Sequence, residues 1–318
     1  MKLLEYEELQ RMVDYSFGDQ SGVICHCPNA YMKKANMNNQ EFINAVNSHK
    51  GEVMSLFIDN IRLYWRPIIH QGWTRTTLLC DQDLEWHKQF RDEDLLDLCS
   101  KFPHKTFVIF TAFEDTPLDE HIEGRIPPNV QSINATQCVY LTDKVVPMPH
   151  GLERHMWNGY NHHEILKKQI SIDTIPSRLL YVNYNDKTDT TGHRTRVKEM
   201  LRGWATVVDT RTQYQQYLEN IQDHKFILCP SGNGMGSARN WETLYLRRVP
   251  VLDWHPYKEV VFKGFPVLFV DDYSELTKEL LESKDHLYQE ALNIDMSKLD
   301  LDIIFNERIE KIITTEGE

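Results

Sequence analysis

The segment from Lys225 to Leu252 constrains the fold of this chain most strongly. It alternates an apolar run, a glycine-rich loop, a helical pattern and a second apolar run. Pro230 ends the first run, and the glycines after it allow backbone N–H groups to approach an anion closely. A helix expected to begin near Ser237 directs its positive end towards that loop. The segment therefore predicts a strand, loop, helix and strand that cradle a phosphate.

Two charged side chains on the expected helix extend this prediction. Arg239 lies in the first turn, where its guanidinium can neutralise a phosphate. Glu242 follows three residues later on the same helix face, and its carboxylate can accept hydrogen bonds from ribose hydroxyls. Together they indicate a site for a nucleoside diphosphate, although such a pair can also be a solvated ion pair on a helix surface. The chain contains no Walker Gly-Lys-Ser/Thr motif, so nothing supports an ATPase.

These motifs resemble those of a known enzyme group. The run from Lys225 to Gly236, the Arg-x-x-Glu of the helix and Val249-Pro250-Val251 are similar to the nucleotide-binding half of exostosin-like glycosyltransferases of the GT-B type. The segment 178–185 resembles the opening strand and Asn-containing loop of that half, and 146–153 resembles its interdomain segment. The resemblance covers about residues 145 to 255. Two positions depart from the pattern and leave the phosphate contacts open, Ser231 and Ala238.

The resemblance implies an α/β fold of the GT-B type, in which two Rossmann-like domains face each other across a cleft. Residues 1–148 would bind the acceptor, 149–300 would bind the nucleotide sugar, and 301–318 would form a C-terminal helix that packs back on the first domain. The implied enzyme moves a sugar from a nucleotide sugar, expected to be a UDP sugar, to an acceptor hydroxyl, with no tightly bound cofactor. The donor-site residues are expected to be Asn183, Arg194, Arg196, Pro230, Ser231, Gly232, Asn233, Gly234, Arg239 and Glu242.

Hydrophobic periodicity supports an α/β fold independently. Apolar strand-like runs alternate with amphipathic helical patterns through both halves of the chain. This alternation predicts parallel sheets covered by helices. The expected strands are 22–25, 53–58, 77–80 and 106–111 in the first half, and 179–184, 205–209, 225–229, 249–253 and 265–270 in the second.

Acidic residues that follow first-half strands are candidates for a catalytic base. Ligands gather at the carboxyl ends of strands in open α/β sheets, so a carboxylate there can remove the proton of an acceptor hydroxyl. Asp59, Glu114 and Asp115 occupy such positions. Each can instead be a helix cap or a loop residue. The sequence does not choose between inverting transfer, which needs a base, and retaining transfer, which can proceed without one. Weaker candidates are His26, His70 and His150.

Residues 61–78 indicate the acceptor, because they contain arginine and tryptophan but no acidic residue. Aromatic rings stack on sugars and on unstacked bases, and clustered arginines favour a partner that carries phosphate. Two acceptors stay open: a glycan, and DNA with hydroxymethylated bases, which phage-type transferases modify and which would require base flipping. A buried tryptophan pair with arginines at its edge is the structural alternative. The expected acceptor residues are Arg62, Trp65, Arg66, Trp73 and Arg75.

Composition narrows the functional classes further. The formal net charge of −12 argues against nucleic-acid binding through overall charge. No run of eighteen apolar residues and no secretory signal are found, and six scattered cysteines suit reduced thiols. We therefore expect a protein of the cytoplasm, or of the host cytoplasm if it is viral, with no membrane span. A non-catalytic protein that binds nucleotide sugars or takes part in assembly is the alternative from another class.

No metal is expected. Asp81 and Asp83 mimic the metal-binding pair of other glycosyltransferases, but Asp81 is well placed to cap the following helix. The run Cys25-His26-Cys27 lacks a second pair of ligands at a recognised zinc spacing. Donor phosphates are instead expected to be neutralised by arginine and by the helix end.

Overall fold

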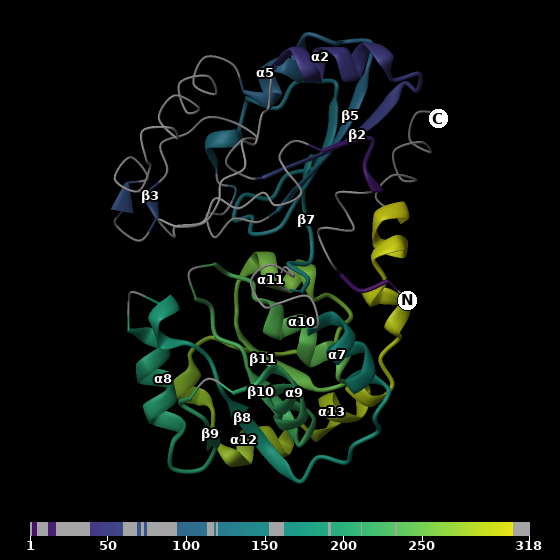
Figure 1. The fold of residues 1–318 in the computed structure, drawn as a ribbon. Helices are drawn as coiled ribbons and strands as arrows, with labels where there is room; N and C mark the ends of the chain where they lie inside the picture. The colour runs from purple at the N-terminus through teal and green to yellow at the C-terminus, as the bar shows by residue number, and fades with distance from the viewer. Residues whose placement is uncertain are drawn as a thin grey trace. The chain divides into compact units, whose positions relative to one another are not determined.

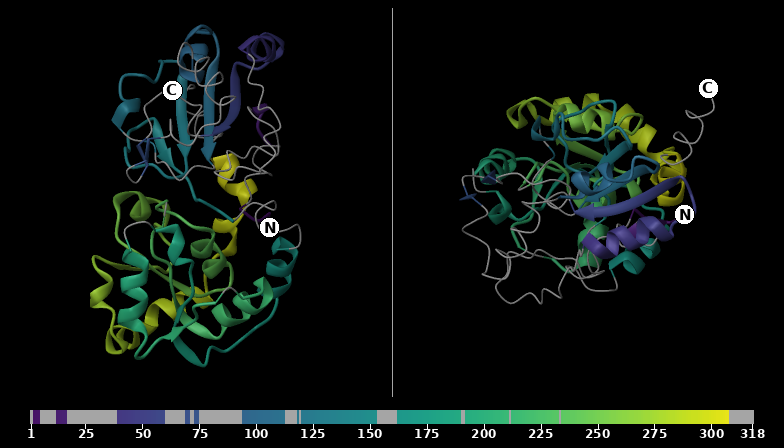
Figure 2. Two further views of the ribbon diagram at one scale, coloured as in Figure 1. Left: turned by 60° about the vertical axis from the view of Figure 1, so that its left-hand side comes forward. Right: turned by 90° about the horizontal axis from the view of Figure 1, so that it is seen from above.

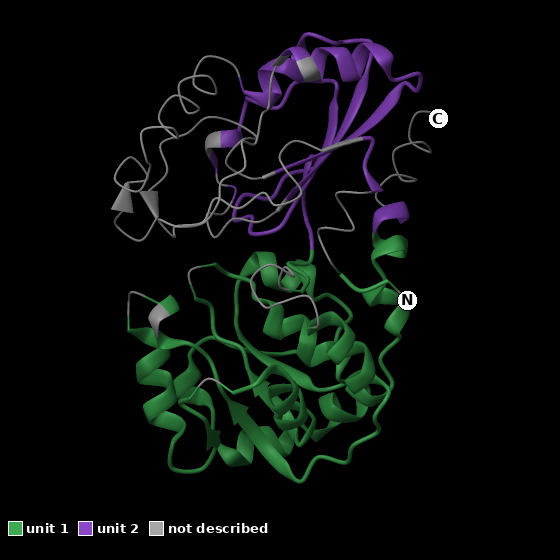
Figure 3. Cartoon of the chain, in the orientation of Figure 1, with its two compact units in different colours: residues 1–5, 149–304 green, residues 6–148, 305–318 purple. Residues whose placement is uncertain are grey.

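The computed structural model describes residues 2–4, 12–16, 39–59, 69–70, 73–74, 94–112, 118, 120–152, 162–189, 192–210, 212–232 and 234–307. The chain divides into two compact units, shown in different colours in Figure 3. Unit 1 comprises Met1–Glu5 and Pro149–Ile304, and unit 2 comprises Tyr6–Met148 and Phe305–Glu318. Each unit contains a five-stranded parallel sheet.

The sheet of unit 1 has the order β12-β11-β10-β8-β9, and Figure 1 labels four of these strands, β8 to β11. From β8 the chain goes outward to β9 and then crosses back over β8 to β10, so the strand order reverses between β8 and β10. This is a doubly wound, Rossmann-like topology, and it confirms the predicted α/β class with parallel strands. The strands are β8 (Arg178–Val182), β9 (Thr206–Val207), β10 (His224–Leu228), β11 (Val249–Asp253) and β12 (Leu268–Val270).

Helices cover both faces of this sheet (Figure 2), as expected for strands whose side chains are buried on both sides. One face packs alternate strand residues such as Leu180, Phe226 and Val251 against α8, α12 and α13. The other face carries Tyr181, which contacts Tyr217 of α9. The helices are α7 (His162–Ile170), α8 (His193–Leu201), α9 (Tyr214–Gln222), α10 (Ala238–Tyr245), α11 (Pro256–Val261), α12 (Lys278–Ser283) and α13 (Asp285–Leu292), with short 3-10 turns η3 (Asp186–Thr188), η4 (Tyr273–Glu275) and η5 (Met296–Leu299).

The sheet of unit 2 has the order β1-β2-β5-β6-β7, and its five described strands follow one another in chain order without a reversal. The expected strands 53–58 and 106–111 are present, whereas 22–25 and 77–80 lie outside the described residues. A short antiparallel ribbon joins β3 (Ile69–His70) to β4 (Trp73–Thr74). The other elements are β1 (Tyr15–Ser16), β2 (Val53–Asp59), β5 (Thr106–Ala112), β6 (Val130–Ala135), β7 (Val145–Pro147), α2 (Asn39–Ser48), α5 (Leu95–Ser100) and η2 (Glu120–Ile122).

The two ends of the chain each join a unit through specific contacts. Residues 2–4 lie in unit 1, where the Leu4 N–H donates to the Tyr245 hydroxyl at 2.8 Å and that hydroxyl donates to the Leu299 carbonyl at 2.8 Å. Residues 301–307 are helical, and the Phe305 ring stacks on Phe110 of unit 2 at 5.1 Å. The rest of the expected C-terminal helix, 308–318, lies outside the described residues. No helix in the described ranges is long and apolar enough to cross a membrane.

The Tyr245 hydroxyl gives a stability prediction. Replacing Tyr245 with Phe removes the partners of a backbone N–H and a carbonyl in buried surroundings, so the free energy of unfolding should fall by about 1–3 kcal/mol. Urea denaturation of the variant and the parent measures the difference. Tyr288→Phe, at another buried tyrosine of unit 1, is the control. Equal stability of Tyr245→Phe and the parent would contradict the role of the hydroxyl.

Candidate functional site

The candidate site lies where the strand order of unit 1 reverses. Loops that follow β8 and β10 leave neighbouring strands at their carboxyl ends, and ligands of doubly wound sheets bind at this switch point. The expected donor residues all come from these two loops and from the helices α8 and α10 that follow them. Of these, Asn233 lies outside the described residues.

Arg194 joins the two loops. Its guanidinium donates to the Ser231 carbonyl at 3.0 Å and the Pro230 carbonyl at 2.8 Å on the glycine loop. On the other loop it donates to the Asn185 carbonyl at 3.1 Å and to the Thr188 hydroxyl. With four hydrogen bonds used in this way, Arg194 shapes the site rather than offering a full guanidinium edge to a phosphate.

Gly232 leaves room for the Arg194 guanidinium in this position. A Cβ atom at position 232 would lie 2.5 Å from a terminal guanidinium nitrogen of Arg194 and 2.7 Å from its Cζ. Gly236 is similarly close to another segment of unit 1, because a Cβ there would lie 3.1 Å from the Cβ of His150. The glycines at these two positions therefore allow close packing of other residues.

An ion pair between the partly exposed Asp253 and the buried Lys258 anchors the start of the glycine loop. Asp253, the last residue of β11, accepts hydrogen bonds from the Ser231 N–H at 3.0 Å, from the Ser231 hydroxyl at 2.8 Å and from Lys258 Nζ at 2.7 Å. Lys258 is fully buried and also donates to the Ser231 hydroxyl at 2.7 Å. The Tyr273 hydroxyl completes the cluster by donating to Asp253 at 2.9 Å.

Electrostatics of this pair favour the charged forms. Burial raises the pKa of Asp253, but the charge of Lys258 and the hydrogen bonds from Lys258 and Ser231 outweigh burial and bring the pKa to about 2. Burial lowers the pKa of Lys258, and the charge of Asp253 opposes that change. Asp253 and Lys258 were not expected at the site from the sequence. The rule that selected Asp59, an acid at the carboxyl end of a strand, also applies to Asp253.

Several cations surround the ring of Tyr184, which follows β8. Lys198 Nζ lies 4.9 Å from the ring centroid, Arg194 Cζ lies 5.4 Å from it and Arg239 Cζ lies 5.9 Å from it. Lys198 is neutralised by Asp186 at 2.7 Å. Burial, and then the neighbouring positive charge of Arg239, lowers the pKa of Arg194 from its ordinary value. Two guanidinium groups therefore concentrate positive charge at the switch point.

Arg239, in the first turn of α10, differs from the other cations. Its Nε is buried and has no hydrogen-bond partner among the described residues. Its Cζ lies 5.8 Å from the ring centroid of Tyr217. Burial opposes the charge of Arg239, but interactions with groups that include Tyr217 and Glu242 prevail and raise its pKa. Arg239 thus stays charged while part of its donor capacity is unused, which suits an anionic ligand.

Glu242 lies one turn further along α10 and is 5% exposed. Its Oε1 accepts from the Tyr214 hydroxyl at 2.7 Å, and its Oε2 accepts from the Tyr217 hydroxyl at 2.9 Å. Both tyrosines belong to α9. His162 of α7 stacks on Tyr214 with ring centroids 3.8 Å apart and planes within 2° of parallel. Glu242 was expected from the sequence but neither tyrosine was, because a contact between α9 and α10 leaves no periodic pattern in the sequence.

The remaining described residues that were expected to bind the donor are Asn183, Arg196 and Gly234. Asn183 directs its amide towards the carbonyls of Val208 and Thr210, each 3.4 Å away, after β9. Arg196 is exposed on α8. Gly234 belongs to the glycine loop, and its carbonyl accepts from the Gly232 N–H at 3.1 Å.

The structure leaves the expected residues of unit 2 untested. Asp59 is the last residue of β2 and Trp73 belongs to β4, but their side chains are not described. The remaining catalytic and acceptor candidates lie outside the described residues; these are Glu114, Asp115, Arg62, Trp65, Arg66 and Arg75. Their roles stay predictions.

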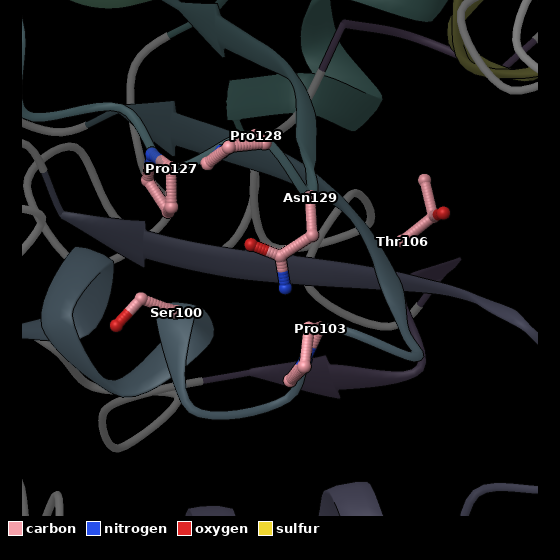
Figure 4. Close-up of a pocket in the computed structure, with 6 residues that line it drawn as sticks. All are labelled: Ser100, Pro103, Thr106, Pro127, Pro128 and Asn129. Carbon is pink, nitrogen blue, oxygen red and sulfur yellow. The ribbon is translucent and has the colours of Figure 1, made fainter.

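Figure 4 shows a hollow in unit 2. None of the described residues that line it is charged, and the amide of Asn129 donates to the carbonyls of Cys99, Phe102 and Lys105 at 2.8, 2.9 and 3.2 Å. No group of three metal-ligating side chains is present in the described ranges. The residues that line the hollow are Ser100, Pro103, Thr106, Pro127, Pro128 and Asn129.

Comparisons with known proteins do not assign the chain to a family. No protein-family model matches the sequence, and no significant match is found among curated proteins. The resemblance to exostosin-like glycosyltransferases therefore depends on the motifs themselves.

Substitution of Gly232 tests the contact between the loops. Gly232→Ala forces the Arg194 guanidinium away from four hydrogen bonds, so we expect a loss of about 1–3 kcal/mol in the free energy of unfolding. Chemical denaturation provides the measurement. Gly203→Ala is the matched control, because a Cβ there meets no atom within 4 Å. If both variants are equally stable, Arg194 does not hold the loop as described.

Acid unfolding tests the Asp253–Lys258 pair. Because the pKa of Asp253 is lower in the folded state than in the unfolded state, its stabilisation is complete above about pH 4 and is lost as the pH falls towards 2. The loss amounts to about 2 kcal/mol. The double variant Asp253→Asn, Lys258→Met removes both charges and should show a correspondingly shallower decline in unfolding free energy between pH 4 and 2. Parallel pH curves for parent and double variant would contradict the pair's contribution.

Proposed function

We propose that unit 1 binds the diphosphate of a nucleotide sugar at the switch point between β8 and β10, and that the chain is a glycosyltransferase. The observation that carries this proposal is Arg239, a charged side chain whose buried Nε has no hydrogen-bond partner among the described residues. It lies at the N-terminus of α10, beside the glycine loop and close to a second guanidinium. A diphosphate would supply further acceptor oxygens and negative charge to the two guanidinium groups.

The residues divide into those that bind and those that hold the site. Arg239 and the N–H groups at the start of α10 would contact the phosphates. Arg194 would keep the two loops together, and the Asp253–Lys258 pair would hold the backbone of Ser231. Arg194 adds its charge at close range without donating a free edge. This division follows from the hydrogen bonds that already occupy Arg194 and Lys258.

The chemistry assigned to unit 1 is stabilisation of a leaving group. Breaking the bond between the sugar and the diphosphate builds negative charge on the phosphate oxygens. A positioned guanidinium and a helix N-terminus stabilise that charge in the transition state. In this proposal a UDP sugar is the donor, a carboxylate from Asp59, Glu114 or Asp115 accepts the proton of the acceptor hydroxyl, and the two units form the GT-B arrangement.

The acceptor is proposed on the composition of residues 61–78, which lie largely outside the described residues. Their arginines and tryptophans suit a glycan or DNA with hydroxymethylated bases. A shared assay can separate the two acceptors. Binding of the nucleotide sugar without transfer to either acceptor would favour the non-catalytic alternative, a protein that binds nucleotide sugars.

Arg239→Ala tests the donor site. The variant loses a charged hydrogen-bond donor, so the dissociation constant for UDP should rise about 10- to 100-fold in calorimetric titration. Arg202→Ala is the matched control, since Arg202 is a partly exposed arginine of unit 1 paired with Glu199 and Asp209. UDP affinity that is the same in both variants would contradict the proposed site. Transfer assays with a UDP sugar, a glycan and plain or hydroxymethylated duplex DNA then identify the acceptor.

A further inference from the structure

Both oxygens of the Glu242 carboxylate are hydrogen-bonded within unit 1. It is 5% exposed, and each of its oxygens accepts a hydrogen bond from a tyrosine of α9. A ribose hydroxyl would have to reach a carboxylate that has little accessible surface and already has a partner on each oxygen. This arrangement argues against a direct contact between Glu242 and the sugar of a nucleotide.

The same carboxylate is connected to Arg239. The Tyr217 hydroxyl donates a hydrogen bond to Glu242 at 2.9 Å, and Arg239 Cζ lies 5.8 Å from the centroid of the Tyr217 ring. Glu242 and Arg239 also lie three residues apart on α10, so they share one face of the helix. Both Tyr217 and Glu242 favour the charged guanidinium. Tyr217 therefore contacts Glu242 through its hydroxyl and Arg239 through its ring.

A third helix supports this arrangement. His162 of α7 stacks in parallel on Tyr214, the second tyrosine that donates to Glu242. Two tyrosines of α9 thus restrain the Glu242 carboxylate of α10, and His162 of α7 restrains one of those tyrosines. Side chains restrained in this way keep a neighbouring group in one geometry, which is the requirement for binding a phosphate with a single guanidinium.

We propose that Glu242 is a positioning residue: with Tyr214 and Tyr217 it holds Arg239 in place for the diphosphate, and it does not contact the ribose. This inference rests on the proposed function of unit 1 as a nucleotide site. If it is right, Glu242 affects the binding of the diphosphate and has no contact with the nucleoside. Changes at Glu242 should therefore alter the affinity for inorganic pyrophosphate and for UDP by the same factor.

The experiment compares inorganic pyrophosphate with UDP in calorimetric titrations of the full chain. The parent protein should bind both, and pyrophosphate should compete with UDP. Glu242→Ala should weaken both ligands by about tenfold, which leaves the ratio of the two dissociation constants unchanged. Tyr217→Phe removes one hydrogen bond while keeping the ring, and it should weaken both ligands in the same proportion as each other.

Matched controls separate positioning from general loss of structure. Glu199→Ala removes an exposed carboxylate of unit 1, and Tyr288→Phe removes a buried tyrosine hydroxyl of the same unit. Neither should change either affinity. Circular dichroism of each variant shows whether it is folded, and Tyr217→Phe provides the test if Glu242→Ala does not fold.

The possible results distinguish this inference from the function on which it rests. Loss of UDP affinity with unchanged pyrophosphate affinity would show that Glu242 contacts the nucleoside, which overturns the inference and leaves the donor site standing. Unchanged affinities for both ligands in Glu242→Ala and Tyr217→Phe would also overturn it. A parent protein that binds neither ligand would refute the donor site and the inference together.

Discussion

The Arg194 guanidinium is the constraint on which the candidate site depends. Loops that follow β8 and β10 diverge from neighbouring strands, and Arg194 reconnects them by donating to backbone carbonyls of Pro230, Ser231 and Asn185. Its bonds to the glycine loop use main-chain atoms, so they set the path of that loop directly. The guanidinium also occupies the space that a side chain at position 232 would need, which explains why glycine is found there.

Burying positive charge costs free energy, and unit 1 offsets that cost with a partner for each buried lysine. Lys258 forms an ion pair with Asp253, and Lys198 forms one with Asp186. Arg194 donates to four oxygen acceptors, but burial, and then the nearby charge of Arg239, lower its pKa. A phosphate at the switch point would relieve the repulsion between these guanidinium groups. The repulsion between the buried cations, which destabilises this cluster without an anion, would then favour anion binding.

Local patterns predicted the strand and helix that frame the site, but they did not assign the partners of its charged residues. The run 225–229, the glycine loop and the helix after Ser237 correspond to β10, its loop and α10. Arg194 was expected to face a phosphate, and it binds two loops. The oxygens of Glu242 bind tyrosines that lie 25 and 28 residues away in the chain. Such contacts depend on how helices pack, which periodicity does not encode.

The amino-acid sequence by itself determined the alternation of strands and helices, the positions of the glycines and the presence of Arg239 in the first turn of a helix. These features depend on local backbone preferences and on the burial of apolar faces. Only the tertiary structure decided that β10 lies beside β8, that Asp253 and Lys258 anchor Ser231, and that Glu242 is enclosed by α9. The physical reason is that strand order and buried charge pairing arise from long-range packing, in which residues far apart in the chain share one low-dielectric environment.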